Sequence, residues 1–226
     1  DKLDMLTSFF SIGKKPTGSG DPFGLRRAAL GVIRILDEAE IDLDLTPILG
    51  STQDDLLAFM TDRLHVYCRD RGLRYDVVRA VMQPDQLADF NVLAIITRIR
   101  ALDAYLTHHD GQRFMPAWRR VHSILVLEQS TSPADRDGDI DIQLFSDQTE
   151  QQLYDALLGL DQHAGDFSND ASKLAAMTTL IEPINAFFEA VKVNDDDQNI
   201  RNNRLQLLSM MDEAVRSFAH LAEIEG

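Results

Sequence analysis

The chain has 226 residues, of which 44% are hydrophobic and 26% charged, and its formal net charge is −15. A chain of this length forms one large domain or two modest ones and can bury a core without disulfides. Its single cysteine excludes an internal disulfide. No apolar run approaches about 18 residues, so the sequence predicts neither a membrane-spanning helix nor a membrane partner.

The charge is unevenly distributed along the sequence. Residues 1–36 carry a net charge of +3 and residues 63–120 carry +4, whereas residues 37–62 carry −8 and residues 121–226 carry −14. Contacts to nucleic-acid phosphates need a basic surface, and salt screens charges beyond about 8 Å, so local patches matter more than the total. Only residues 1–36 and 63–120 favour such contacts.

The apolar periodicity predicts an all-α fold. An N-cap at Asp21 followed by Pro22 predicts the start of the second helix. Pro183 predicts a kink or break, and Ile140–Leu144 is the one short candidate for a strand. Residues 130–141 are expected to form a loop. The expected helices cover residues 2–11, 22–36, 54–68, 74–82, 85–106, 115–127, 148–160, 171–191 and 197–224.

The second of these helices carries a basic face. At 100° per residue, Arg27 and Arg34 fall within about 20° of each other on the side opposite the apolar stripe, with Arg26 nearby. The helix follows a glycine-rich loop that holds Lys14 and Lys15. These five cations form a first basic patch that could face phosphate.

The glycine-rich loop has the spacing of a nucleotide-binding loop but not its chemistry. Gly13 and Gly18 are separated as in a Walker A motif, yet Ser19 and Gly20 stand where Lys and Ser or Thr are required. Without that lysine the β- and γ-phosphates have no charged partner. The sequence therefore favours a simple turn.

The tripeptide His108-His109-Asp110 invites a metal-site interpretation. Adjacent side chains on a helix point about 100° apart, so two neighbours rarely converge on one ion. With Gly111 following, the tripeptide is better interpreted as a solvated helix end. The sequence predicts no metal site.

Two arginines on the last predicted helix have different expected roles. Arg204 lies about 30° from the apolar stripe, which predicts a structural arginine paired with an acid such as Glu189 or Asp197. Arg201 lies about 90° from the stripe, so both a structural role and a phosphate contact remain open for it.

Three blocks, in the same order as in a known family, carry a resemblance. They are Asp1–Leu6 with Asp21–Ile35, then Arg119–Leu125, and finally Ile184–Glu189 with Asn203–Leu208. They resemble the beta subunit of bacterial heterotetrameric glycyl-tRNA synthetase. The family's pattern in the middle block is Lys-Arg-Val-x-Asn-Ile-Leu. Here Arg119 stands in place of the Lys, and Ser123 stands in place of the Asn. The last block resembles that subunit's anticodon-binding helical domain, a type shared with arginyl-tRNA synthetase.

The resemblance implies a C-terminal fragment of that subunit, built of helical bundles. Residues 1–84 would be the C-terminal part of a body region similar to HD phosphohydrolases, and residues 85–226 the anticodon-binding-like domain. Asp1 looks like the aspartate that closes the HD signature, and the other metal ligands of that signature would lie outside this chain. The resemblance therefore implies neither a metal site nor a catalytic residue here.

The resemblance also implies a function. The fragment would be a cytoplasmic, tRNA-binding and anticodon-recognising portion of a glycine-tRNA ligase, which attaches glycine to tRNA-Gly with ATP. The alpha subunit of the heterotetramer would carry the glycyl-adenylate chemistry. The whole enzyme would use ATP and Mg, and this fragment would need no cofactor.

A rival hypothesis is a helical module that holds subunits or domains together with little RNA contact, and the charge of −14 in residues 121–226 favours it. Pairing with neighbouring acids is likewise an alternative to RNA contact for the arginines of the first patch. The candidate tRNA-binding residues are Lys14, Lys15, Arg26, Arg27 and Arg34, a second patch of Arg113, Arg119 and Arg120, and Arg201.

Overall fold

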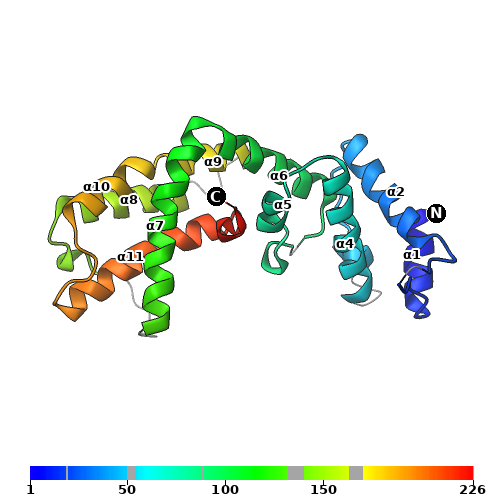
Figure 1. The fold of residues 1–226 in the computed structure, drawn as a ribbon, viewed down its shortest axis with the longest axis horizontal. Helices are drawn as coiled ribbons and strands as arrows, with labels where there is room; N and C mark the ends of the chain where they lie inside the picture. The colour runs from blue at the N-terminus through cyan, green and yellow to red at the C-terminus, as the bar shows by residue number, and fades with distance from the viewer. Residues whose placement is uncertain (19, 50–53, 88, 132–139, 163–169, 226) are drawn as a thin grey trace. The chain divides into compact units, whose positions relative to one another are not determined.

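The computed structural model describes residues 1–18, 20–49, 54–87, 89–131, 140–162 and 170–225. Every regular element within these ranges is a helix (Figure 1). Their β pairing is limited to isolated bridges between Thr17 and Gly20 and between Asp44 and Asn91. The predicted all-α fold class is confirmed. None of the helices in these ranges is long and apolar enough to cross a membrane.

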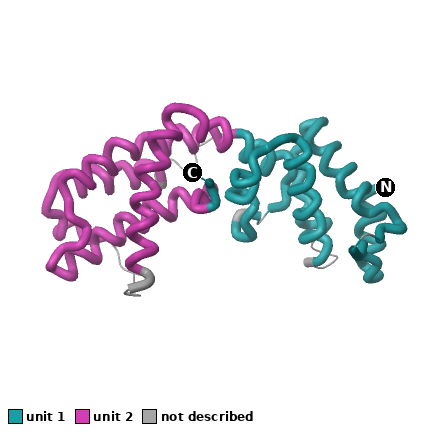
Figure 2. Tube along the Cα trace, viewed as in Figure 1, with its two compact units in different colours: residues 1–100, 223–226 teal, residues 101–222 magenta. Residues whose placement is uncertain are grey.

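The chain divides into two compact units (Figure 2). Unit 1 contains Asp1–Arg100 together with Glu223–Gly226, and unit 2 contains Ala101–Ala222. Helix α6 (Val92–Thr107) begins in the first unit and ends in the second. The expected division of the chain between residues 84 and 85 stays a prediction.

Unit 1 is organised around α2, which packs against both α1 and α4. The apolar side chains Leu25, Ala29 and Ile33 recur every four residues on one face of α2 and are fully buried. After α4 the unit continues through α5 and η2 and ends within the first part of α6. The elements of this unit are α1 (Lys2–Ser11), α2 (Leu25–Glu38), α3 (Thr46–Leu49), α4 (Asp54–Asp70), α5 (Tyr75–Val81) and the short 3-10 turn η2 (Pro84–Gln86).

Helix α2 begins three residues later than the sequence predicts. Gly24 precedes the helix with a φ of 67°, a left-handed conformation that glycine adopts without strain. The carboxylate of Asp21 nevertheless accepts hydrogen bonds from the backbone N–H groups of Leu25 (2.8 Å) and Arg26 (3.0 Å). Asp21 therefore caps the helix as expected, but across an intervening turn.

The last residues of the chain pack within unit 1. The backbone N–H of Glu225 donates to Asp76 Oδ2 over 3.1 Å, and Arg79 pairs with Glu223. Asp76 also accepts from Arg74 Nη2 over 2.6 Å. The short C-terminal segment is thus tied to α5 by hydrogen bonds and an ion pair.

Unit 2 is a bundle in which α8 and α7 each pack against both α10 and α11. Its apolar stripes meet in a core that includes Phe114, Leu153, Phe187 and Leu207, each fully buried. The elements that follow α6 are α7 (His109–Thr131), η3 (Ile142–Leu144), α8 (Gln148–Gln162), α9 (Asp170–Thr178), α10 (Ile181–Ala190), α11 (Gln198–Arg216) and η4 (Leu221–Glu223).

Helices α6 and α7 are joined by a very short connection at His108. The sequence predicts a gap between residues 106 and 115, but α7 begins at His109 and includes Gly111. A Cβ atom on Gly111 would lie 2.1 Å from the carbonyl oxygen of Tyr105. Glycine is therefore required here by the close approach of the two backbones, and it does not end a helix.

Two more helix boundaries differ from the predictions. Helix α6 starts at Val92 instead of residue 85, since Pro84–Gln86 forms η2 and the side chain of Asn91 accepts from the N–H of Ala94. The last predicted helix ends at Arg216, where the predicted range runs to residue 224.

The remaining differences concern Pro183 and the candidate strand. The predicted helix over 171–191 is interrupted at residues 179–180, and Pro183 lies in the first turn of α10, where its missing N–H costs no helical hydrogen bond. Ile142–Leu144 forms the turn η3, so the short candidate for a strand at Ile140–Leu144 does not form one. Most of the loop predicted over 130–141 lies outside the described residues.

Candidate nucleic-acid interface

A basic ridge runs along the exposed face of α2. Arg27, Gly31 and Arg34 follow one another at four- and three-residue steps, and both arginines are exposed. The side chain of Lys2 from α1 crosses this row, because a Cβ atom on Gly31 would lie 2.9 Å from Lys2 Cε. Lys2, Arg27 and Arg34 have no carboxylate partner among the described residues. These three cations are called the α2 ridge below.

The other cations of the first predicted patch differ in how much of their charge is neutralised. Lys15 Nζ lies 2.9 Å from Asp55 Oδ2, and Arg26 Nη2 donates to the carbonyl oxygen of Gly18 over 2.6 Å. Lys14 is exposed and makes no ion pair within the described part of the chain. The charge of Lys15 is thus countered by a carboxylate, whereas Arg26 is hydrogen-bonded to the backbone of the glycine-rich loop.

The second predicted patch separates into three different environments. Arg113 pairs with Glu182, and the guanidinium of Arg120 lies 4.0 Å from the ring centroid of Phe188, a cation–π contact. Arg119 is exposed. Arg113 and Arg120 are seven residues apart and lie within about 20° of each other on α7, where both contact side chains of α10. Arg119 is turned about 100° away from Arg120.

Arg201 and Arg204 are both held by carboxylates. Arg201 pairs with Glu128 of α7, and the side chains are 19% and 14% exposed. The structural role predicted for Arg204 is confirmed, but its partners are Glu150 (2.9 Å) and Asp195 (2.7 Å) instead of the two acids named above. Hydrogen bonds from the backbone of Asp197 and from Arg204 hold the pKa of Asp195 below its ordinary value.

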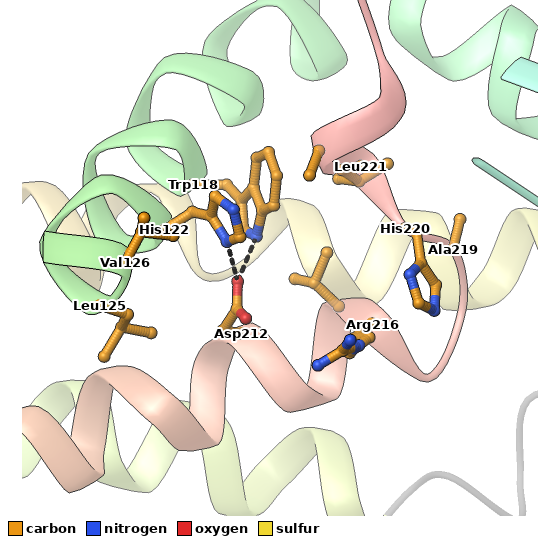
Figure 3. Close-up of a pocket in the computed structure, with 11 residues that line it drawn as sticks. Trp118, His122, Leu125, Val126, Asp212, Arg216, Ala219, His220 and Leu221 are labelled. Carbon is orange, nitrogen blue, oxygen red and sulfur yellow. Dashed lines mark hydrogen bonds and ion pairs between the residues drawn. The ribbon is translucent and has the colours of Figure 1, made fainter. Parts of the chain in front are cut away.

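A pocket of about 190 Å³ lies between α7, the C-terminal half of α11 and the segment that follows it (Figure 3). Asp212 Oδ1 accepts from Trp118 Nε1 over 3.1 Å and lies 3.2 Å from His122 Nδ1. The Trp118 and His122 rings stack with their centroids 4.9 Å apart. Arg216 and His220 line the other side of the pocket.

This pocket is not identified from the sequence alone. The four-residue spacing of Trp118 and His122 was a usable signal, because it places both rings on one face of a helix. Their partner Asp212 lies 94 and 90 residues further along the chain. No local pattern connects positions so far apart, so the cluster becomes visible only when α7 and α11 are packed together.

The tripeptide at the α6–α7 connection is a solvated polar cluster. His108 Nδ1 and His109 Nδ1 lie 3.3 Å and 3.6 Å from the carboxylate of Asp110, and both histidine side chains are mostly exposed. Over the described ranges, no group of three His, Cys, Asp or Glu side chains is arranged to hold a metal ion.

Comparisons with known proteins assign both parts of the chain. Residues 1–83 match the family model described as "Glycyl-tRNA synthetase beta subunit", and residues 115–225 match the "DALR anticodon binding domain". The chain joins a glycyl-tRNA synthetase beta-subunit domain to a DALR anticodon-binding domain. The family resemblance inferred from the sequence is confirmed. The α2 ridge lies in the first of these domains, and the pocket lies in the second.

A curated relative covers both domains together. Over 237 aligned positions the chain is 36% identical to the "Glycine--tRNA ligase beta subunit" of Ruegeria sp. (strain TM1040). The alignment includes all of this chain but 34% of the relative, so the chain spans about a third of that protein's length.

Proposed function

We propose that this chain is the tRNA-binding, anticodon-recognising portion of a glycyl-tRNA synthetase beta subunit. Its task is to position tRNA-Gly while the whole enzyme attaches glycine with ATP. In this role the chain itself carries out no chemical step. The observation that carries the proposal is the match of residues 115–225 to an anticodon-binding domain within a chain that is similar throughout to a glycine-tRNA ligase beta subunit.

Unpaired cations support RNA contact at the α2 ridge. A carboxylate close to a cation already offsets the charge that a phosphate would otherwise meet. Arg113 and Arg201 are paired in this way, which favours structural roles for them, as for Lys15. Arg27 and Arg34 are exposed without such a partner in the described ranges, so we assign phosphate contacts to them, with Lys2 and Lys14 adding to the positive field.

The proposal includes a partner and cofactors outside this chain. In a beta subunit the remaining machinery would come from an alpha subunit that binds ATP and Mg and forms the glycyl adenylate. We assign the metal to that alpha subunit. A cytoplasmic location accompanies this role, because that is where charged tRNA is used.

Binding of three RNAs tests the proposal. The chain is titrated with tRNA-Gly, with the same tRNA carrying a different anticodon, and with an unrelated tRNA, each at several salt concentrations. We expect tightest binding to tRNA-Gly and an affinity that falls with rising salt, since phosphate contacts release counterions. Arg27→Gln and Arg34→Gln should each weaken binding to all RNAs and reduce the salt slope by about 1.

A control and a rival outcome complete this experiment. Arg69 is an exposed arginine of α4 whose Nη2 lies 3.5 Å from Asp70, so Arg69→Gln should leave both affinity and salt slope unchanged. Equal and negligible binding to all three RNAs would contradict the proposal. If the chain then captured the alpha subunit, the assembly-module hypothesis would replace it.

A further inference from the structure

The pocket of unit 2 has the size of a site for one small ring. Its volume of about 190 Å³ is below the 300–1,000 Å³ that is usual for pockets that hold larger ligands. Apolar side chains such as Leu125 and Leu221 supply part of the wall, and four polar or ionisable side chains supply the rest. A mixed wall of this kind suits a flat, partly polar group.

One side of the pocket is an aromatic platform fixed in place by Asp212. Trp118 is 3% exposed, and its indole covers one face of the His122 ring at an interplanar angle of 22°. The carboxylate of Asp212 orients both rings through their nitrogens (Figure 3). The imidazole of His122 lines the pocket, and its side chain is 34% exposed, so the ring is held in one orientation and is partly open for stacking.

A hydrogen-bonding edge lies beside the platform. Arg216 follows Asp212 by four residues on α11, so the carboxylate and the guanidinium are neighbours on one helix face, and both line the pocket. Asp212 can only accept hydrogen bonds, and Arg216 can only donate them. An acceptor next to a donor complements the edge of a nucleobase, which presents a donor next to an acceptor.

A further cation lies next to the pocket along α7. Arg119 is exposed and precedes His122 by three residues, which makes the two side chains neighbours on the helix surface. Arg120, one position on, instead lies over Phe188. A nucleotide with its base in the pocket would thus have a guanidinium near its phosphate.

We infer that this pocket holds one unpaired pyrimidine base of the bound tRNA, stacked on His122 and hydrogen-bonded to Asp212 and Arg216. The inference rests on the proposed function and gives it a specific site in the second unit. Pyrimidines are favoured because a single ring matches the cavity better than the double ring of a purine. Unpaired bases that stack on aromatic side chains and bond through their edges are the usual targets of sequence-specific RNA recognition.

A double-mutant cycle between the protein and the RNA tests the inference. Each unpaired pyrimidine of the anticodon loop of tRNA-Gly is replaced in turn by a purine, and each RNA is titrated against the parent chain and against Asp212→Asn. We expect one loop position at which the purine weakens binding to the parent about tenfold or more. At that position the variant should lose affinity for the unmodified tRNA and show little further loss with the purine.

Asp155→Asn is the matched control, because Asp155 is an exposed carboxylate on α8 of the same unit and its loss changes the net charge equally. This variant should retain the parent's full penalty for the purine. Asn at position 212 keeps an oxygen that can accept from Trp118 Nε1, and circular dichroism would confirm that the variant is folded. If it is not, Arg216→Gln provides the same cycle from the other polar group of the pocket.

The possible failures can be told apart. If the parent binds tRNA-Gly in a salt-dependent manner but every purine penalty is the same in Asp212→Asn, the pocket is not the base site and the proposed function stands. If a purine binds as tightly as a pyrimidine at every position, the inference is overturned in the same way. If the parent binds no RNA even at low salt, the proposed function fails and the pocket assignment fails with it.

Discussion

Arg204 Nε donates to Glu150 Oε1 over 2.9 Å, and the two side chains are 5% and 0% exposed. Their remaining polar atoms also have partners. Arg204 donates to Asp195 as well, and Glu150 Oε2 accepts from the backbone N–H of Ser146 over 2.8 Å. The pair therefore links α11 to the first turn of α8. Because both charges are buried, removal of Arg204 leaves the carboxylate of Glu150 without its cation.

Replacement of Arg204 tests this link. Arg204→Met retains much of the side-chain volume but leaves the carboxylate of Glu150 buried without its cation, so the free energy of unfolding should fall by about 3–5 kcal/mol. Urea denaturation followed by circular dichroism measures the change. Arg69→Met, which removes a mostly exposed arginine, should change the same quantity by less than about 0.5 kcal/mol. A loss of stability in Arg204→Met as small as that in Arg69→Met would show that the buried pair contributes little.

Two helical glycines should respond in opposite directions to a methyl group. At Gly111 a Cβ atom would lie 2.1 Å from the carbonyl oxygen of Tyr105, so Gly111→Ala must push α6 and α7 apart and should destabilise the chain by about 1–3 kcal/mol or more. At Gly159 of α8 no described atom outside its own stretch of helix lies within 4 Å of the same position, so Gly159→Ala should stabilise the chain by about 0.5–1 kcal/mol. Thermal unfolding of the two variants checks the opposite signs.

The helices of this fold are largely predictable from the sequence, and their ends are less so. A 3.6-residue apolar period identifies a buried face such as Leu25, Ala29 and Ile33 without any tertiary information. The exact start of α2 depends on the left-handed turn at Gly24, and that of α6 depends on the cap at Asn91. Such turns are chosen by packing of the whole unit, which a local pattern does not encode.

The ion-pair partners of charged side chains are even harder to predict from the sequence than the ends of helices. The angle of Arg204 to the apolar stripe correctly predicted a structural role, because burial follows from position on a helix face. Its partner Glu150 lies 54 residues away, and Arg113 and Arg201 find their acids 69 and 73 residues away. Which cations remain available for RNA is therefore a property of the assembled helices.

The stability of unit 1 should depend on pH through Asp76. Burial alone would raise the pKa of this carboxyl, but hydrogen bonds from Arg74 and from the backbone of Glu225 and Val77 bring it below its ordinary value. A lowered folded-state pKa means that the stabilisation is complete above the unfolded-state pKa of about 3.9 and is lost as the pH falls through the folded-state pKa. The charged carboxylate thus stabilises the unit at neutral pH.

Denaturation of the parent and of Asp76→Asn between pH 7 and pH 3 measures this contribution. The variant should be less stable at pH 7, and its free energy of unfolding should decline less steeply below about pH 4 than that of the parent. Asp70→Asn, at an exposed carboxylate of α4, should keep the parent's acid profile. Parallel profiles for the parent and Asp76→Asn would refute the assignment.

The thiol of Cys68 should be unreactive as long as the chain is folded. Its side chain is fully buried, and burial, aided by the nearby charge of Asp37, raises its pKa to about 12. At pH 8 only about one thiol in ten thousand would then be the nucleophilic thiolate, whereas an ordinary cysteine with a pKa of about 8.5 would be roughly a quarter ionised. Alkylation with iodoacetamide, followed by mass spectrometry, should therefore be slower by orders of magnitude in buffer than in concentrated urea. A rate in buffer equal to that in urea would mean that the core around α4 opens freely, whereas a slow rate that rises with added denaturant would report directly on the unfolding of unit 1.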